Sequence, residues 1–170
     1  MYQASVPVFV QYLASLSGLL DEADSHARAK NLDAAVLPNA RLAPDMYPLH
    51  RQVGEAIRHV VLACALLTDV PTPPMPDTTP DIAALKARIA TTLTFLNALQ
   101  PRQFEGTGAK DVIFTFRNGS TRAFTGQSLL LTFSMPQFFF HVTTAYDILR
   151  HSGVDLKKKH FLGQPPAPMG

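Results

Sequence analysis

The sequence has few charged residues. Charged side chains make up 16% of its 170 residues and hydrophobic ones 46%, whereas an average soluble domain has about 25% charged residues. A disordered chain needs high charge and few large apolar groups, and the outer positions of a coiled coil are rich in Glu and Lys. The composition therefore excludes both classes. It predicts a globular domain with little charged surface, where apolar surface is covered by a partner or open to a ligand.

The sequence also has only one cysteine, and it shows neither a signal-peptide pattern nor a long apolar run. The single cysteine, Cys64, excludes an intramolecular disulfide and a zinc site built from several cysteines. The N-terminal stretch MYQASVPVFV lacks the basic region and cleavage motif of a signal peptide, and no apolar run reaches the roughly 18 residues of a spanning helix. The net charge of +2 is too balanced to predict nucleic-acid binding. We therefore expect a cytoplasmic protein without a nucleic-acid or membrane partner.

Three segments carry apolar residues at steps of three and four, the pattern of one apolar stripe on a helix. These helices are expected over residues 6–30, 46–67 and 81–99. Their expected N-caps, whose side chains accept a backbone N–H bond, are in order Ser5, Asp45 and either Thr79 or Asp81.

A β-hairpin is expected over residues 111–124. Two β-prone stretches flank Asn118-Gly119, and this pair is a strong hairpin signal because both residues tolerate positive φ. Two strands alone are marginally stable in water, so the hairpin should pack on the rest of the chain.

The last long segment, residues 126–151, is apolar nearly all round, which is typical of a central, buried helix. Pro136 should kink or divide this helix, and Gly153 should provide a left-handed cap. The tail over residues 154–170 is expected to be irregular. The chain thus predicts one all-α domain over residues 1–170, a four-helix bundle with a small β-hairpin inserted before the last helix. Its long connections allow a crossover topology.

Three stretches resemble a known family. They are LPNARLAPDMYPLHRQV (residues 37–53), RIATTLTFL (residues 88–96) and MPQFFFHVTTAYDILRHSGV (residues 135–154). They look like a domain-of-unknown-function family from bacteria and fungi, within the DinB/YfiT-like superfamily of four-helix bundles. The resemblance covers nearly the whole chain. It implies the bundle fold and a homodimer, but no established reaction.

The resemblance also points to a metal site. The wider superfamily often holds a divalent metal ion with three histidines, one from the second helix and two from an H-x-x-x-H pair on the fourth. His141 matches the first member of that pair, but Ala145 stands at the second position. The resemblance therefore implies an incomplete site for a divalent metal such as Zn, Ni, Mn or Fe.

The second helix offers two histidines as partners for His141. At about 100° per residue, His50 lies at the edge of the apolar stripe, whereas His59 lies on the opposite, exposed side. If His141 binds a metal ion, His50 is therefore the expected partner ligand. For His141 itself, a buried histidine bonded to a neighbouring carbonyl or carboxylate is favoured over metal ligation, and a metal-free ligand contact is a third interpretation.

Four further polar residues in the matched stretches are candidates to bind a ligand with His141. Asp45 can instead cap a helix, and Arg150 can simply favour a helix C-terminus. Gln52 can bond into the bundle or face solvent. Tyr146 lies about 140° around the helix from His141, so the two face different sides of a regular helix.

The sequence contains no nucleophile motif, phosphate loop, dinucleotide fingerprint or nucleic-acid signature. The leading hypothesis is a DinB-like homodimer that binds a small, mostly apolar ligand in a bundle cavity near His141. One alternative is a metal-dependent transferase or hydrolase that uses His141 and His50. Another is a structural dimerisation module without catalysis. The residues leave open whether the protein is an enzyme.

Overall fold

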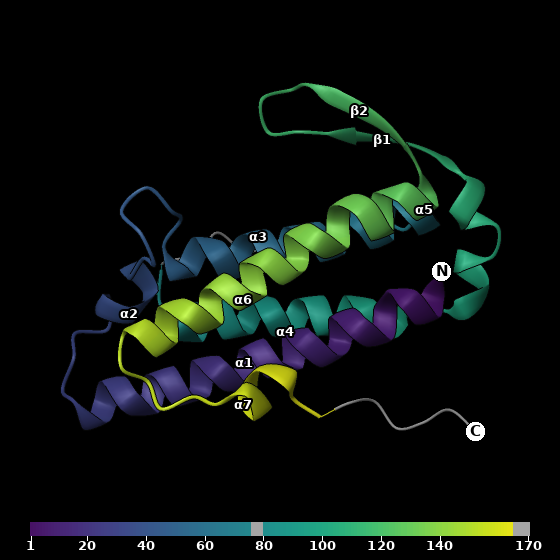
Figure 1. Ribbon diagram of the computed structural model, residues 1–170. Coiled ribbons are helices and arrows are strands. Elements are labelled where there is room, and N and C mark those ends of the chain that lie inside the picture. The colour runs from purple at the N-terminus through teal and green to yellow at the C-terminus, as the bar shows by residue number, and fades with distance from the viewer. Residues whose placement is uncertain (76–79, 165–170) are drawn as a thin grey trace.

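Four long helices form a bundle in the computed structural model, which describes residues 1–75 and 80–164 (Figure 1). The helices are α1 (Val6–Ala29), α3 (Leu49–Thr68), α4 (Ile82–Ala98) and α6 (Met135–His151). α1 and α3 each pack on both α4 and α6. Residues 30–48, which include the short α2 (Val36–Asn39), cross from the end of α1 to the start of α3. The predicted helical bundle is confirmed.

The interior of the bundle is filled by the predicted apolar stripes. Phe9, Ile57, Ile89 and Phe138 come from the four helices and are at most 1% exposed. The rings of Phe9 and Phe138 meet edge to face with centroids 5.1 Å apart. Each such buried side chain stabilises the fold by about 1.5–3 kcal/mol, so the stripes account for the association of the helices.

α3 is enclosed on two sides. Twelve of its 20 residues are buried, against seven of 17 in α6. α1 and α4 cover one part of its circumference, and α6 covers another. The last helix, predicted to be buried all round, instead has an exposed side on which Phe140 is 54% exposed.

The last helix runs through Pro136 without being divided. α5 (Gly126–Ser128), a π-helical segment η4 (Leu129–Ser134) and α6 follow one another directly, and Pro136 lies in the first turn of α6. The wider π turn leaves room for a proline ring, which in a regular α-helix would clash with the carbonyl four residues earlier. Gly153, after the helix, has a φ of +90°, as predicted.

The predicted hairpin is present and lies over α3 and the start of the last helix (Figure 1). β1 (Asp111–Thr115) pairs antiparallel with β2 (Thr121–Thr125). Gly119 has a φ of +83°, but Asn118 keeps a negative φ, so the turn is wider than the two-residue turn that Asn-Gly predicts. The hairpin is anchored by a small apolar cluster consisting of Val112, Phe114, Phe124 and Leu129, with Leu62, Leu66, Phe116 and Phe133 packed against it.

Ser5 is the N-cap of α1, as predicted, but makes no side-chain capping bond, and the predicted cap Asp45 is wrong. The Ser5 hydroxyl donates to the carbonyls of Met1 and Tyr2 instead of accepting from the helix. α3 begins at Leu49, so Asp45 precedes it in an exposed loop and is not its cap. Asp81 is the cap of α4 and accepts from the Ala84 N–H at 2.6 Å, whereas Thr79 lies outside the described residues.

The tail is partly helical, where an irregular segment was predicted. Residues Lys158–Leu162 form α7, which packs on α1. The Ser15 hydroxyl of α1 lies 2.6 Å from the carbonyls of both His160 and Phe161. These hydrogen bonds fix the tail on the bundle. The rest of the predicted tail, residues 165–170, lies outside the described residues.

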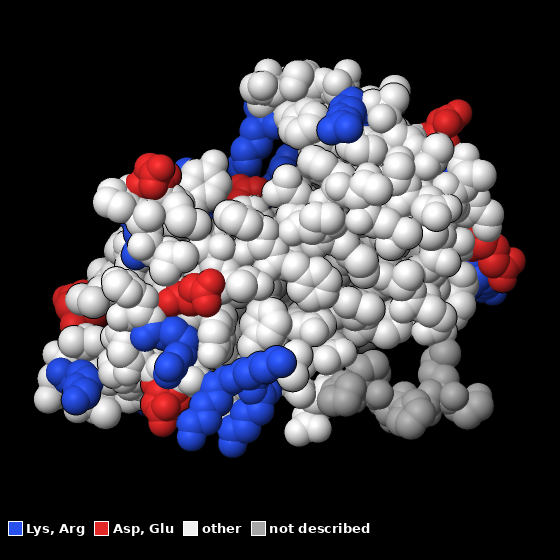
Figure 2. Space-filling view, viewed as in Figure 1, with Lys and Arg blue, Asp and Glu red and all other residues white. Residues whose placement is uncertain are grey.

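The face of the molecule seen in Figure 2 carries few charged side chains over α5 and α6. The charges gather at the end near α2 and along the edge near α7. Several large apolar side chains are exposed, among them Ile113, Leu131 and Phe140. The low charge content of the sequence is therefore visible as a largely uncharged face.

Among the described residues, no single helix is long and apolar enough to cross a membrane. In the described part of the chain, one bent pair of helical segments meets the same criterion of length and composition: α4 and residues Pro101–Ala109, at 87° to each other.

Candidate functional site

Three side chains that can bind a metal ion converge between α3 and α6. They are Glu55 and His59 of α3 and His141 of α6, and one ligand atom of each lies within 4.8 Å of the other two. Each is only 5–7% exposed. Glu55 and His59 are four residues apart and therefore share one face of the helix, and α6 packs on α3. We call these three residues the Glu-His-His cluster.

Gln52 fixes the orientation and protonation of His141. Its Oε1 lies 2.7 Å from Nδ1 of His141, while its Nε2 donates to the Tyr47 carbonyl at 3.0 Å. Because Oε1 can only accept, the His141 proton is on Nδ1 and the lone pair is on Nε2. A histidine held from behind in this way is typical of metal ligands.

His59 has a buried nitrogen without a protein partner. Its ring stacks between those of His141 (centroids 5.9 Å apart) and Phe114 (6.4 Å), and Phe133 approaches it edge-on at 5.5 Å. Within the described part of the chain, Nδ1 of His59 makes no hydrogen bond. Since buried polar atoms nearly always have a partner, a bound ion would satisfy this nitrogen. The cluster therefore fits a metal ion.

Burial favours the neutral form of both imidazoles. The pKa of His59 is lowered from 6.5 to about 4, mainly by burial and further by the neighbouring His141 and Arg58, while Glu55 opposes the shift. Burial also lowers the pKa of His141, although Glu55 opposes this shift. Neutral imidazole is the form that binds a metal, so both histidines are ready for an ion at neutral pH.

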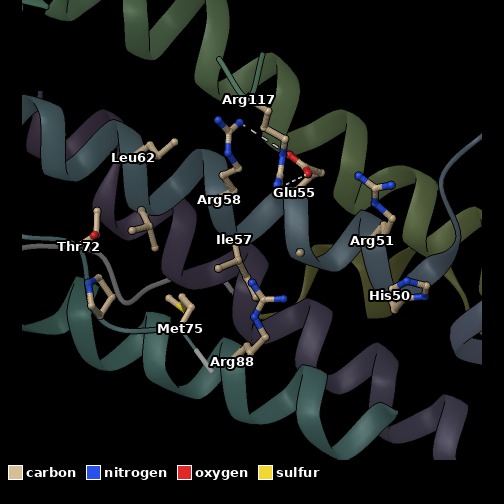
Figure 3. Close-up of a pocket in the computed structure, with 13 residues that line it drawn as sticks. His50, Arg51, Glu55, Ile57, Arg58, Leu62, Thr72, Met75, Arg88 and Arg117 are labelled. Atoms are coloured by element: carbon tan, nitrogen blue, oxygen red, sulfur yellow. Dashed lines mark hydrogen bonds and ion pairs between the residues drawn. The ribbon is translucent and has the colours of Figure 1, made fainter. Parts of the chain in front are cut away.

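Glu55 connects the cluster to the hairpin. Arg117, from the loop between β1 and β2, donates to Oε1 of Glu55 at 2.6 Å, and Arg58 lies 3.8 Å from Oε2 (Figure 3). Basic and acidic atoms are visible beneath the tip of the hairpin in Figure 2. The hairpin thus covers the cluster with both an aromatic ring, Phe114, and a cation.

A pocket of about 510 Å³ borders Glu55 (Figure 3). It lies between α3, α4 and the extended segment after α3, and it does not include His141. Its lining residues are His50, Arg51, Gly54, Glu55, Ile57, Arg58, Val61, Leu62, Thr72, Pro73, Met75, Arg88 and Arg117.

Among the candidate residues proposed from the sequence, His141 and Gln52 form a hydrogen bond with each other. His50 is not in the cluster, because its Nδ1 lies 3.0 Å from the Pro38 carbonyl. His59, predicted to be exposed, is 5% exposed and stacks on His141. That prediction was wrong because it assumed one buried stripe, whereas α3 is covered on two sides.

The other three candidates lie elsewhere in the fold. Asp45 is exposed in the loop before α3. The ring of Tyr146 packs on that of Phe161 of α7, with centroids 5.7 Å apart. Arg150 lies 4.0 Å from Asp155, just after α6. The Tyr146 ring thus packs against the tail, whereas the Arg150–Asp155 contact is long and exposed and contributes little.

Glu55 was missed, although the sequence contains a signal for it. Gln52, Glu55 and His59 follow one another at spacings of three and four, which places them on one face of a helix. These polar residues form a stripe on the side of α3 opposite its apolar stripe, and this side of α3 is also buried.

The pH dependence of stability should reveal the neutral His59 in metal-free protein. Its pKa is about 4 when folded and about 6.5 when unfolded. Between these values the unfolded state binds more protons, so stability is fully present above pH 6.5 and falls as the pH falls through 4. A shift of this size corresponds to a loss of at most about 3 kcal/mol. Urea unfolding from pH 7 to pH 4 should show a shallower loss for His59→Gln, and equal slopes for the two proteins would contradict the expectation.

Comparison with known proteins identifies a similar solved structure and the family of the chain. A search of the curated proteins gives no match. Among solved structures, the chain is similar to a DinB family member protein from Shewanella denitrificans, with 33% identity and a TM-score of 0.88 over 99% of this chain and 95% of that one. The resemblance to DinB-like bundles is thereby confirmed. The model of a domain of unknown function, DUF1993, matches residues 1–162, and since this is nearly the whole sequence, the chain belongs to the DUF1993 family.

Proposed function

We propose that this protein binds one divalent transition-metal ion at Glu55, His59 and His141 and acts as a metal-dependent enzyme of the hydrolase or transferase class. The observation that carries the proposal is the Glu-His-His cluster itself, with three ligand atoms within 4.8 Å of one another. Nδ1 of His59, which has no hydrogen-bond partner among the described residues, supports it.

The donor set suits zinc and related ions. Two imidazole nitrogens and one carboxylate oxygen are a known catalytic zinc set, and imidazole also suits iron and nickel. Three protein ligands leave a position open for water or substrate. When bound, the ion would supply Lewis acidity and lower the pKa of a bound water.

The surrounding residues prepare the cluster for this role. Gln52 holds the proton of His141 on Nδ1, which keeps Nε2 available. Arg117 and Arg58 hold the Glu55 carboxylate. The rings of Phe114 and Phe133 lie against His59 and shield it from water. In the superfamily pattern, the missing histidine at Ala145 is compensated in our proposal by a carboxylate from α3.

The surroundings of the cluster do not favour the mostly apolar ligand predicted from the sequence. The bordering pocket does not include His141, and its described lining combines Glu55 and four arginines with apolar side chains such as Ile57 and Val61. The homodimer and the cytoplasmic location stay predictions.

Metal content tests the proposal. Untagged protein loaded with Zn²⁺ and then desalted should hold about one ion per chain by elemental analysis, whereas His141→Ala and His59→Gln should lose it. His50→Gln is the matched control, because His50 bonds the Pro38 carbonyl outside the cluster. Circular dichroism checks that each variant is folded. Wild-type protein with far less than one ion, or a His141→Ala variant that keeps its ion, would overturn the proposal.

A further inference from the structure

The hairpin contacts two of the three side chains of the Glu-His-His cluster. Phe114 of β1 stacks on the ring of His59, with centroids 6.4 Å apart and an angle of 5° between the ring planes. Arg117, at the tip of the hairpin, donates to Oε1 of Glu55 at 2.6 Å (Figure 3). Glu55 lies 62 residues before Arg117 in the sequence. A distant segment of the chain therefore contacts the proposed ligands directly.

The bond from Arg117 runs from the surface to a buried carboxylate. The Arg117 side chain is 64% exposed, whereas that of Glu55 is 9% exposed. An exposed ion pair contributes little to stability, but a buried carboxylate is oriented by the groups that bond it. Arg117 bonds Oε1, while Arg58 lies 3.8 Å from Oε2. The hairpin thus holds one carboxylate oxygen and leaves the other for an ion.

Arg58 joins the hairpin to the same carboxylate from the α3 side. Its guanidinium lies 5.5 Å from the centre of the Phe114 ring, and its side chain is 22% exposed. When the hairpin is docked, Arg58 is therefore covered by Phe114 and Glu55 lies between two guanidiniums. These contacts restrict the rotamers of the Glu55 side chain.

The hairpin can leave the bundle without unfolding it. In the described part of the chain its two strands pair only with each other, and such a pair is marginally stable by itself. It is anchored by the small apolar cluster around Phe114 and Phe124, while Ile113 on its outer side is 65% exposed. Elements held by few buried contacts open locally, and opening would break both contacts with the metal cluster at once.

Hairpin docking and metal binding therefore act on the same two side chains. In the docked state, Arg117 fixes the Glu55 carboxylate and Phe114 fixes the His59 ring. Less rotamer freedom is then lost when an ion binds. Coupling between two equilibria is reciprocal, so an ion that keeps Glu55 and His59 in this orientation stabilises the docked hairpin by the same factor.

We propose that Arg117 is a positioning residue of the metal site, and that metal binding and hairpin docking stabilise each other through Glu55 and His59. This rests on the proposed function, because it requires an ion at the Glu-His-His cluster. It adds a means of regulation, since any event that loosens the hairpin lowers the metal affinity without changing a ligand.

A zinc competition titration tests the role of Arg117. Arg117→Gln is expected to bind zinc about tenfold more weakly than the wild type, at the lower end of the effect of groups that orient metal ligands. The lower end applies because loss of the guanidinium also removes a charge that repels the ion. Arg117 is exposed, so the variant should fold, and circular dichroism checks this.

Arg122→Gln is the matched control for this titration. Arg122 is exposed on β2 and lies 4.9 Å from the centre of the Phe124 ring. Its replacement removes the same charge from the same hairpin but leaves the bond to Glu55 intact. Arg122→Gln should therefore keep the wild-type zinc affinity.

Hydrogen exchange of the hairpin amides tests the reciprocal effect. Amides over residues 111–125 should exchange when the hairpin leaves the bundle, because its pairing is marginal alone. Saturating zinc is expected to slow this exchange about tenfold in the wild type and in Arg122→Gln, and by a smaller factor in Arg117→Gln. If Arg117 only stabilised the fold, Arg117→Gln would speed the exchange in metal-free protein and leave the effect of zinc unchanged.

The two measurements separate this proposal from the metal site. Equal zinc affinities of Arg117→Gln and Arg122→Gln, tighter zinc binding by Arg117→Gln, or hairpin exchange that zinc does not slow would each overturn the coupling. The metal site would still stand if the wild type held about one zinc ion that His141→Ala loses. If the wild type takes up no zinc, the proposed function fails and the coupling fails with it.

Discussion

The Gln52→Leu variant is expected to bind zinc about 10- to 100-fold more weakly than the wild type, although all three proposed ligands are intact. Gln52 is 1% exposed, and its amide links the Tyr47 carbonyl to Nδ1 of His141. Leucine has a similar volume but no acceptor. Without the acceptor, the imidazole is free to carry its proton on Nε2 and to rotate, which removes the lone pair aimed at the ion.

The measurement is a zinc competition titration with a chromophoric chelator. Gln52→Glu is the matched variant, because a carboxylate also accepts from Nδ1, although it cannot donate to the Tyr47 carbonyl, and it should bind zinc more tightly than Gln52→Leu. A thermal melt of each variant separates metal affinity from stability. If Gln52→Leu lowered the melting temperature but kept the wild-type zinc affinity, Gln52 would be a packing residue only.

Gly126→Ala is expected to destabilise the fold by more than about 3 kcal/mol, at or above the usual range for overpacking. A Cβ at this position would lie 1.9 Å from the Thr107 carbonyl oxygen and 2.7 Å from Cδ2 of Leu67. The Thr107 backbone has little freedom to move, because Thr107 is buried and its hydroxyl donates to the Phe104 carbonyl at 2.9 Å. Gly126 also donates to the Lys110 carbonyl at 2.8 Å, so the clash would displace the base of the hairpin.

Urea unfolding of Gly126→Ala beside Gly18→Ala provides the comparison. A Cβ at Gly18 in α1 meets no atom within 4 Å, so that alanine should stabilise the helix by about 0.5–1 kcal/mol. The two variants make the same chemical change in opposite surroundings. A Gly126→Ala protein as stable as the wild type would show that the junction of hairpin and helix tolerates the added methyl group.

The helices could be predicted from the sequence because the apolar pattern that indicates them lies within each helix. A stripe of apolar residues at steps of three and four, such as Phe9 to Leu20, is the condition for burying one side of a helix. The hairpin followed from β-prone stretches around Asn118-Gly119 for the same reason. The helical tail did not follow, since Ser15 fixes it through contacts between segments far apart in the sequence. The start of α3 was missed because Pro48, and not Asp45, is its N-cap.

The candidate site was only half predictable. His141 stood out as a histidine in an apolar helix, and Gln52 was among the residues considered. Glu55 and His59 were not predicted as site residues, because a helical wheel with one buried stripe assigns the opposite side of the helix to solvent. In this fold the hairpin and α6 cover that side of α3, so polar residues there become buried and meet His141.

By itself, the sequence determined the helix periods, the hairpin and the family, because these depend on neighbouring residues and on the order of motifs along the chain. Only the tertiary structure decided which polar side chains meet. The distances among Glu55, His59 and His141, and the contact of Arg117 with Glu55, depend on how α3, α6 and the hairpin pack together. Burial and electrostatic coupling are properties of that packing, and they set the pKa of His59.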